Sequence, residues 1–352
     1  MKQSEKLGSP SAPADLIALA EVVERFAGKR VVVLGDFVAD SFQYGDIDRV
    51  SREAPVLILR HRETRILPGG AANATSNFAA LGARVLPITA VGDDAAGDSL
   101  LQAFRDKKID VSGILRVKGR VTPTKIRFLA GWAHTVGQQV LRVDYEPQSP
   151  LAESHRKRMQ ELLTARLKKA DALAISDYGL GVASPESVQH AMSGVRRPIP
   201  VSLDSRYRLT AYKRAGVTAA TPNEAEMEAL HHTTIGQDTS ELERCGRETL
   251  QEMKLRSLVV TRGKDGMAVF QPRENTVHIP VHGSDQAVDV TGAGDTVLAA
   301  YTLGLASGAS PVEAAHIANI AGGLVVMKRG TATVSRDELL EAIRKAASET
   351  TP

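Results

Sequence analysis

The segment Asp289-Val-Thr-Gly-Ala-Gly-Asp-Thr296 places a carboxylate inside a glycine-rich turn that leads directly into an apolar helical pattern. Gly292, Ala293 and Gly294 carry little side-chain bulk, so their backbone N–H groups can approach an anion at the positive end of the helix dipole. Asp295 would lie beside that anion, where a carboxylate can accept a proton from a hydroxyl that attacks a phosphoryl group. The alternative is an ordinary helix cap, for which aspartate is a favoured residue.

Two further motifs carry groups suited to a polyol. In Leu67-Pro-Gly-Gly-Ala-Ala-Asn73, the glycines Gly69 and Gly70 leave room for close approach, and Asn73 can both donate to and accept from hydroxyls. Tight helix–strand packing would explain the same glycines. Asp36 and Asp40 flank the end of the first buried strand and suit hydroxyl recognition, although Asp40 could instead cap the following turn.

Two other motifs suit a nucleotide and its metal. Asn223 and Glu226 are three residues apart in the first turn of a helical pattern, so they share a face and could hold a hydrated magnesium ion. Stabilisation of Glu226 by the helix dipole is the alternative explanation. The segment from Thr261 through Gly263 to Gly266 reads as a strand, a glycine turn and a second strand, a hairpin able to support a nucleotide.

The elements that must position these residues alternate between buried strands and amphipathic helices. This alternation predicts an α/β fold, in which a mainly parallel sheet is covered by helices on both faces and ligands bind at the carboxyl ends of the strands. The expected strands are 30–34, 85–90, 172–176, 200–203, 216–221 and 258–261, and the expected helices are 16–26, 71–81, 97–107, 153–169, 223–230 and 240–254.

Two stretches break the alternation, near 45–65 and 121–145, and their polar/apolar alternation predicts a small antiparallel β lid over the ligand edge. Residues 1–14 are rich in Ser, Pro, Gly and Lys and are expected to form a disordered tail before one domain over 15–350. Exposed edges of the lid favour pairing with a second copy, so we expect a homodimer through the lid.

The composition excludes several classes of protein. A net charge of +3 is too small to indicate nucleic acid as the main partner, and the single cysteine, Cys245, rules out an internal disulfide. No apolar run is long enough to span a bilayer, and the N-terminus lacks the order of a signal peptide. We therefore expect a cytoplasmic protein that binds small molecules and no membrane.

Taken in order, the motifs Gly69-Gly70-x-x-Asn73, Asn223-x-x-Glu226, Thr261-x-Gly263-x-x-Gly266 and Asp289-x-Thr-Gly-Ala-Gly-Asp295 resemble those of the ribokinase-like (PfkB) carbohydrate kinases. The resemblance covers residues 28–346. It implies a ribokinase-like fold, ATP and Mg²⁺ as cofactors, and Asp295 as the general base of transfer to a sugar hydroxyl. It also implies Asn319 near the nucleotide base, and K⁺ held by Asp289, Thr291, Val326, Arg329, Thr331 and Ser335.

Within that family, the stretches 48–56, 67–74, 176–178 and 328–335 look like the kinases that phosphorylate the anomeric oxygen of D-glycero-β-D-manno-heptose 7-phosphate for lipopolysaccharide core synthesis. These kinases are often fused to a nucleotidyltransferase, and the present chain resembles their stand-alone form. A phosphorylated sugar needs cations at its far end, for which Arg127 and Arg142 are candidates beside Arg49, Arg52 and Lys125. Each of these could equally be a solvated strand residue.

The chain departs from the heptose kinase pattern at places that leave the acceptor open. Leu180 stands where a lysine is usual, and Arg206 replaces the lysine of an Asp-Pro-Lys-Gly segment. The alternatives are therefore another kinase of the family, fructokinase-like or ribokinase-like, acting on an unphosphorylated sugar, and a regulator that binds sugar or nucleotide without catalysis. The presence of Asp295 beside a complete anion hole disfavours the regulator.

Overall fold

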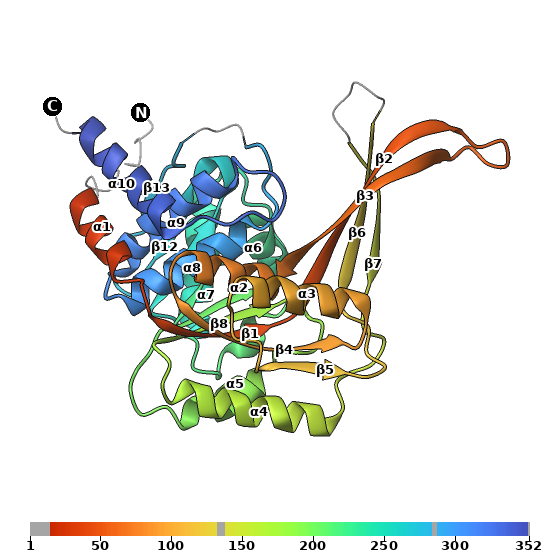
Figure 1. The fold of residues 1–352 in the computed structure, drawn as a ribbon. Coiled ribbons are helices and arrows are strands. Elements are labelled where there is room, and N and C mark those ends of the chain that lie inside the picture. The colour runs from red at the N-terminus through yellow and green to blue at the C-terminus, as the bar shows by residue number, and fades with distance from the viewer. Residues whose placement is uncertain (1–14, 132–137, 284–286, 351–352) are drawn as a thin grey trace.

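The computed structural model describes residues 15–131, 138–283 and 287–350 of the 352-residue chain. The tail expected to be disordered, residues 1–14, lies outside the described residues. Figure 1 shows a body of helices packed on a twisted sheet, with a narrower β lid that projects from one end of it.

The body is built on a nine-stranded sheet. Its order is β13-β12-β11-β10-β9-β8-β1-β4-β5, parallel except that β12 runs antiparallel to both of its neighbours. This confirms the expected mainly parallel sheet. The bounds are β1 Arg30–Gly35, β4 Arg84–Gly92, β5 Ile114–Val117, β8 Ala172–Asp177, β9 Val201–Ser205, β10 Ala219–Ala220, β11 Ser257–Thr261, β12 Met267–Phe270 and β13 Val277–Ile279.

Helices cover both faces of this sheet, which explains why its strands show no polar/apolar alternation. In β1, Val31 and Val33 pack into one core cluster, while Val32 and Leu34 pack into the other. The first core includes α1 Leu16–Glu24, α2 Ala71–Ala80, α8 Ala293–Ala306, α9 Pro311–Val325 and α10 Arg336–Thr350. The second includes α4 Glu153–Leu167, α5 Pro185–Ser193, α6 Glu224–His231 and α7 Thr239–Met253, and α3 Ala95–Asp106 packs in a third cluster near the lid.

The lid is a four-stranded sheet of order β3-β2-β6-β7, with β2 Phe37–Val50, β3 Leu57–Gly70, β6 Thr124–Gly131 and β7 Gln138–Tyr145. Both hairpins are antiparallel as expected, but β2 and β6 pair in parallel. The parallel pairing follows from the topology, since both strands leave the body in the same direction. Because β2 follows β1 after one residue and β3 leads directly into α2, the base of the lid carries Asp36, Gly69 and Gly70.

One expected strand is much shorter in the structure. Residues 216–221 form only the two-residue strand β10. Gly216 has a φ of 77°, a left-handed conformation that belongs to a turn, so the extended segment begins after it. The shortened strand leaves Thr221 and Asn223 at the sheet edge, where they enter α6.

Candidate active site

The glycine-rich turn lies at the N-terminus of α8 and packs against α2. Gly292 adopts a φ of 79°, and a Cβ atom there would lie 2.3 Å from Nδ2 of Asn73. Only glycine fits both the backbone conformation and this close approach. The turn that the sequence assigns to an anion therefore lies directly against the Gly-Gly-x-x-Asn motif. The two motifs can thus belong to one site.

Asp295 is held by a chain of amide and hydroxyl groups. Nδ2 of Asn73 donates to Oδ2 of Asp295 at 2.8 Å, and Oδ1 of Asn73 accepts from Nδ2 of Asn77 at 3.3 Å. Oγ1 of Thr296 donates to Oδ1 of Asn77 at 2.9 Å. Asn73, expected to contact a sugar hydroxyl, thus orients the carboxylate, a role that its spacing in the sequence did not indicate.

The environment of Asp295 suits a proton acceptor at neutral pH. Burial raises the pKa of this carboxyl to about 7, and the charge of Asp40 acts in the same direction. The hydrogen bond from Asn73, the charge of Lys125 and the hydroxyl of Tyr178 oppose that rise. A general base works best when its pKa is near the working pH. Asp295 is only 3% exposed, far more buried than an ordinary capping aspartate requires.

The expected contact between Asp36 and a sugar hydroxyl is wrong. Asp36 is fully buried, and its carboxylate accepts hydrogen bonds from the backbone N–H groups of Tyr178, Leu180 and Val182 at 3.0, 3.1 and 3.0 Å. Burial raises its pKa to about 6 against the effect of these bonds. Asp36 therefore fixes the loop after β8, and its oxygens are already occupied.

Asp40 instead lies next to the base of the lid hairpin. A Cβ atom on Gly69 would lie 2.2 Å from Oδ2 of Asp40, so the missing side chain at Gly69 makes room for this carboxylate. Nη1 of Arg127, on β6, donates to Oδ1 of Asp40 at 2.5 Å, and both side chains are largely buried. The structure thus brings together Gly69, Asp40 and Arg127, three of the residues expected to bind sugar. Arg127, on the lid, is the ion-pair partner of Asp40.

Arg142 lies opposite Arg127 in the pairing of β6 and β7. Its guanidinium forms two hydrogen bonds to Asp144, with 2.7 Å between Nε and Oδ1, and these bonds are the main reason that its pKa is raised. The two arginines thus share one face of the lid. Lys125 and Asp144 occupy another cross-strand pair of the same hairpin.

A cleft of about 190 Å³ opens on the other side of the glycine-rich turn. It is lined by Ala293 and Gly294 of that turn and by the four residues expected to contact nucleotide, Thr261, Gly263, Gly266 and Asn319. Its apolar walls, which include Val281, Val290, Val297 and Val326, suit the flat face of a base. Sequence reasoning assigned none of these valines to the nucleotide, because they belong to separate segments of the chain.

Asn223 and Glu226 form a reciprocal cap at the start of α6. Oδ1 of Asn223 accepts from the Glu226 amide at 2.9 Å, and Oε2 of Glu226 accepts from the Asn223 amide at 3.0 Å. Asn223 was expected to hold magnesium together with Glu226. In the structure its side-chain oxygen instead accepts the capping hydrogen bond. Glu226 keeps a second carboxylate oxygen, and its pKa is raised, mainly by burial.

Asp204, at the end of β9, lies among these carboxylates and was not singled out from the sequence as a site residue. Burial raises its pKa well above the ordinary value, and the charges of Glu226 and Asp295 add to the effect. Arg206 lies two residues after Asp204 in the chain, and its charge opposes the rise in the pKa of Glu226. Crowded carboxylates of this kind favour a cation between them. Within the described residues, no group of three or more His, Cys, Asp or Glu side chains is arranged to hold a metal directly.

The residues expected to hold K⁺ surround the loop after α9. Asp289 accepts from the amides of Thr291 and Gly330 at 2.9 and 2.8 Å, and the carbonyl of Val326 accepts from the amides of residues 288 and 289. Ser335 caps α10 through Glu338. Oγ1 of Thr331 is buried without a hydrogen-bond partner among the described residues, which fits an oxygen ligand of a cation.

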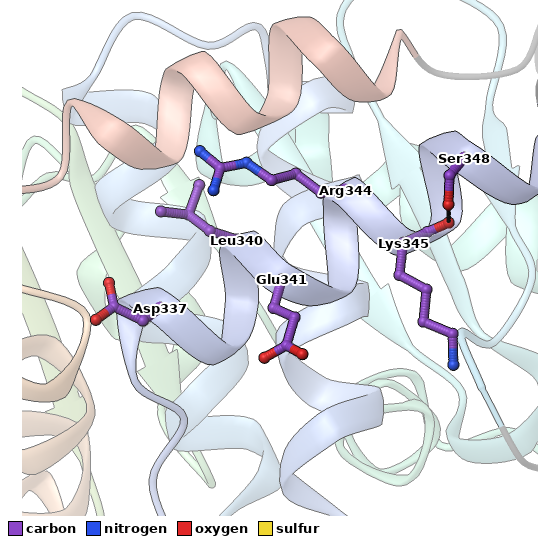
Figure 2. A pocket seen from close by; sticks show the side chains of 6 residues that line it. All are labelled: Asp337, Leu340, Glu341, Arg344, Lys345 and Ser348. Atoms are coloured by element: carbon purple, nitrogen blue, oxygen red, sulfur yellow. Dashed lines mark hydrogen bonds between the residues drawn. The ribbon is translucent and has the colours of Figure 1, made fainter.

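A larger hollow lies along α10, and none of the residues expected in the site lines it. Figure 2 shows its lining, in which the acids Asp337 and Glu341 and the bases Arg344 and Lys345 come from a single helix. Arg344 turns toward α1 and pairs with Glu24. Side chains from one exposed helix make a surface groove without converging groups, so this hollow is not the reaction site.

Among the described helices, none has the length and apolar character needed to cross a membrane.

Comparison with known proteins shows the family to which this chain belongs. The model of the pfkB family of carbohydrate kinases matches residues 29–338. The chain is 39% identical to the bifunctional protein HldE of Mesorhizobium japonicum over 335 residues, which is 94% of this chain and 65% of that protein. It is 38% identical to HldE of Geobacter sulfurreducens over 313 residues, 89% of this chain and 62% of that protein. The chain thus spans less than two thirds of the length of these relatives.

Solved structures share the fold at lower identity. Phosphofructokinase-2 from Escherichia coli, in a complex with potassium, superposes with a TM-score of 0.73 at 21% identity, covering 91% of this chain and 99% of that one. Arabidopsis thaliana ribokinase, complexed with ribose and ATP, superposes with a TM-score of 0.69 at 20% identity, covering 90% of this chain and 99% of that one. These likenesses confirm the ribokinase-like fold.

Proposed function

We propose, from the premise that this chain belongs to the pfkB family of carbohydrate kinases, that it phosphorylates the anomeric oxygen of D-glycero-β-D-manno-heptose 7-phosphate. The chain is an ATP-dependent sugar kinase, and the product of this reaction would be the 1,7-bisphosphate. The observation that carries the chemistry is the position of Asp295. It lies between the Gly-Gly-x-x-Asn motif and the cleft beside the glycine-rich turn, and its carboxylate accepts a hydrogen bond from the side-chain amide of Asn73.

In the proposed reaction, the sugar hydroxyl enters beside Asp40 and Asp295. Asp295 accepts the hydroxyl proton as the oxygen attacks the γ-phosphorus of ATP, the O–P bond to ADP breaks, and ADP leaves with the displaced electron pair. The backbone N–H groups of Gly292, Ala293 and Gly294 lie at the N-terminus of α8, where those of Gly292 and Gly294 would stabilise charge on the transferring group. The N–H of Ala293 donates to the carbonyl of Val290 at 3.2 Å, so Ala293 would join them by giving up this bond. Because the two glycine groups are fixed before reaction, they need no rearrangement.

Magnesium, carried with ATP, would supply charge neutralisation at the phosphates. Glu226 fits this cation through its remaining carboxylate oxygen and through waters, with Asn223 acting as the cap that fixes Glu226 in place. For K⁺, the candidate set is Asp289, Thr291, Val326, Arg329, Thr331 and Ser335, and the buried Oγ1 of Thr331 supports it. A monovalent cation there would support the turn from behind.

The heptose 7-phosphate assignment rests on the segments that resemble heptose kinases and on the basic face of the lid. The similarity to HldE over 94% of this chain agrees with it. Lys125, Arg127 and Arg142 gather on the β6–β7 hairpin, and the charge of Arg142 lowers the pKa of Lys125. Grouped cations beside a sugar site suit a phosphate at the distal end of the sugar. We place the reaction in the cytoplasm, where ATP is available.

A homodimer through the lid is part of the proposal. β3 and β7 are the edge strands of the lid sheet, and β7 exposes Leu141 at 55% and Tyr145 at 51%. An apolar edge strand is a surface that another strand or sheet covers. A second copy of this chain is the partner whose own lid carries the matching surface.

Another sugar kinase of the family is the competing function, since Leu180 lacks the cation usual in heptose kinases. An assay of ADP release over a panel of acceptors decides between them. The panel holds D-glycero-D-manno-heptose 7-phosphate, the unphosphorylated heptose, fructose, fructose 6-phosphate, ribose and ribose 5-phosphate. We expect kcat/KM to be highest with heptose 7-phosphate. Preference for an unphosphorylated sugar would overturn the assignment of the acceptor while keeping the kinase.

A further inference from the structure

The loop after β8 places an aromatic ring against the base. Tyr178 follows β8 directly, and its backbone N–H donates to Oδ2 of Asp36 at 3.0 Å. Its hydroxyl lies 3.5 Å from Oδ1 of Asp295, while Asn73 binds Oδ2 of the same carboxylate. Two donors on the two oxygens define the plane of the carboxylate more strictly than either does alone.

The ring of Tyr178 is held from two sides. A Cβ atom on Gly70 would lie 3.3 Å from its Cε2, so the absence of a side chain at Gly70 gives the ring its space. On the lid, Nζ of Lys125 lies 5.2 Å from the ring centroid, a cation–π contact. The backbone, the ring and the hydroxyl of Tyr178 are thus each fixed by a different element.

Lys125 is the point at which the lid reaches this ring. It belongs to β6 and is paired in register with Asp40 of β2, so it comes from the same strands as the Asp40–Arg127 ion pair. Burial lowers the pKa of Lys125, and the nearby carboxylate of Asp40 opposes that shift. The charge of Lys125 also lowers the pKa of Asp295.

We propose that Tyr178 is a positioning residue of phosphoryl transfer, whose hydroxyl orients the carboxylate of Asp295 and whose ring couples that carboxylate to Lys125 of the lid. This inference rests on the proposed role of Asp295 as the base. Lys125 has its position over the ring only when β6 lies against the body. Strand β6 of the lid therefore affects the protonation state of Asp295 through Lys125.

Other charged groups also act on Tyr178 and Asp295. Burial is the main cause that raises the pKa of Tyr178, and the charges of Asp295, Asp204 of β9, Asp40 of β2 and Glu226 of α6 add to it. Burial also raises the pKa of Asp295, and Asp40 acts in the same direction. These carboxylates are negative charges, and they act against ionisation of either group. The charge of Lys125 acts in the opposite direction and favours the carboxylate form of Asp295.

The test measures the ionisation of Asp295 directly. Infrared difference spectra of the ligand-free protein follow the protonated carboxyl band during a pH titration, and the band that disappears in Asp295→Asn belongs to this residue. The variants are Tyr178→Phe, which removes the hydroxyl and keeps the ring, and Lys125→Met, which removes the cation. Tyr301→Phe is the matched control, because Tyr301 is a buried tyrosine whose hydroxyl donates to Ser257 at 2.7 Å elsewhere in the core.

We expect Tyr178→Phe and Lys125→Met each to move the Asp295 midpoint to higher pH by roughly half to one unit, because each loses a group that favours the carboxylate. Tyr301→Phe should leave the midpoint unchanged. In a Tyr178→Leu background, where the ring is absent, Lys125→Met should cause a smaller shift than in the wild type. Equal shifts in the two backgrounds would overturn the coupling through the ring.

The acid limb of kcat with the preferred acceptor should move by the same amount in Tyr178→Phe. An unchanged midpoint and an unchanged acid limb in this variant would overturn the positioning role, even if Asp295→Asn abolishes turnover. Retained turnover in Asp295→Asn would instead overturn the role of the base itself. The two failures are therefore distinguishable.

Discussion

Asn73 and Asp295 are separated by 222 residues, yet Nδ2 of Asn73 lies 2.8 Å from Oδ2 of Asp295. The bond joins the first helix after the lid hairpin to the N-terminus of α8. It ties together the two motifs that sequence patterns assign to the sugar and to the phosphate. The base and the acceptor site are therefore built as one unit.

Replacement of Asn73 by alanine should lower kcat by on the order of 100-fold, because it removes a donor that orients the base and favours its ionised form. Steady-state kinetics with the preferred acceptor measures this. Asn77→Ala is the matched variant: it keeps the donor to Asp295 and loses the bonds of Asn77 to Asn73 and Thr296, so its effect should be smaller. A wild-type kcat in Asn73→Ala would contradict the orienting role.

A methyl group at Gly69 should weaken sugar binding selectively. Its Cβ would lie 2.2 Å from Oδ2 of Asp40, so the carboxylate would have to move. We expect the KM for the sugar to rise about tenfold or more and the KM for ATP to stay unchanged. Gly194→Ala is the control, because its added Cβ would meet only a carbonyl at 3.7 Å. Equal changes in both KM values would argue against a sugar-side role for Asp40.

The raised pKa of Asp295 predicts how the stability of the protein depends on pH. The folded state holds the proton up to about pH 7, whereas the unfolded state releases it near 3.8, so the fold loses stability as pH rises through this window. Asp295→Asn has no such loss. It should unfold with up to about 4 kcal/mol more free energy than wild type above pH 7, since the shift is roughly three units. Near pH 4 the difference should vanish.

Urea unfolding at several pH values checks this stability prediction. Asp295 is fully enclosed, so solvent screening does not reduce the effect as it would at the surface. An Asn variant that is less stable than wild type at pH 8 would contradict the assigned burial cost of the charge. We therefore expect Asp295→Asn to be more stable than the wild type but inactive, as when a residue serves catalysis at a cost in stability.

The lid should mediate self-association. Light scattering should give the mass of a dimer, and Leu141→Glu should shift the protein toward the monomer by placing a charge on the exposed apolar edge of β7. Ile17→Glu, which changes a 70% exposed side chain on α1, should have no effect. A monomeric wild-type protein at the same concentration would refute the dimer.

Local motifs predicted much of the fold and residues that line the cleft beside the glycine-rich turn. The glycine turn at 292–294 and the hairpin at 261–266 each lie within a few residues, so their sequence contains the geometry that they adopt. Asp36 could not be interpreted in this way, because its partners are amides 142 to 146 residues away. Long-range partners are set by the topology of the sheet and leave no local pattern.

The sequence also contained a helix-capping signal that was not recognised. Asn223-x-x-Glu226 is the spacing of a capping box, in which each side chain binds the other residue's amide, and the structure shows this arrangement. Tyr178 and Asp204 were not chosen as site residues, and Lys125 was considered only as a cation for the phosphate of the sugar, since no local pattern relates any of the three to Asp295. Their importance comes from the way in which the lid and two strand ends meet at Asp295.

The central claim is that Asp295 is the base for phosphoryl transfer to a sugar. Its most direct test is the turnover of Asp295→Asn with ATP and the preferred acceptor, followed by ³¹P NMR of the product, with binding of both ligands measured by calorimetry. We predict that kcat falls by about 1,000-fold or more while both dissociation constants stay close to those of the wild type. Near-normal turnover in this variant would contradict the account.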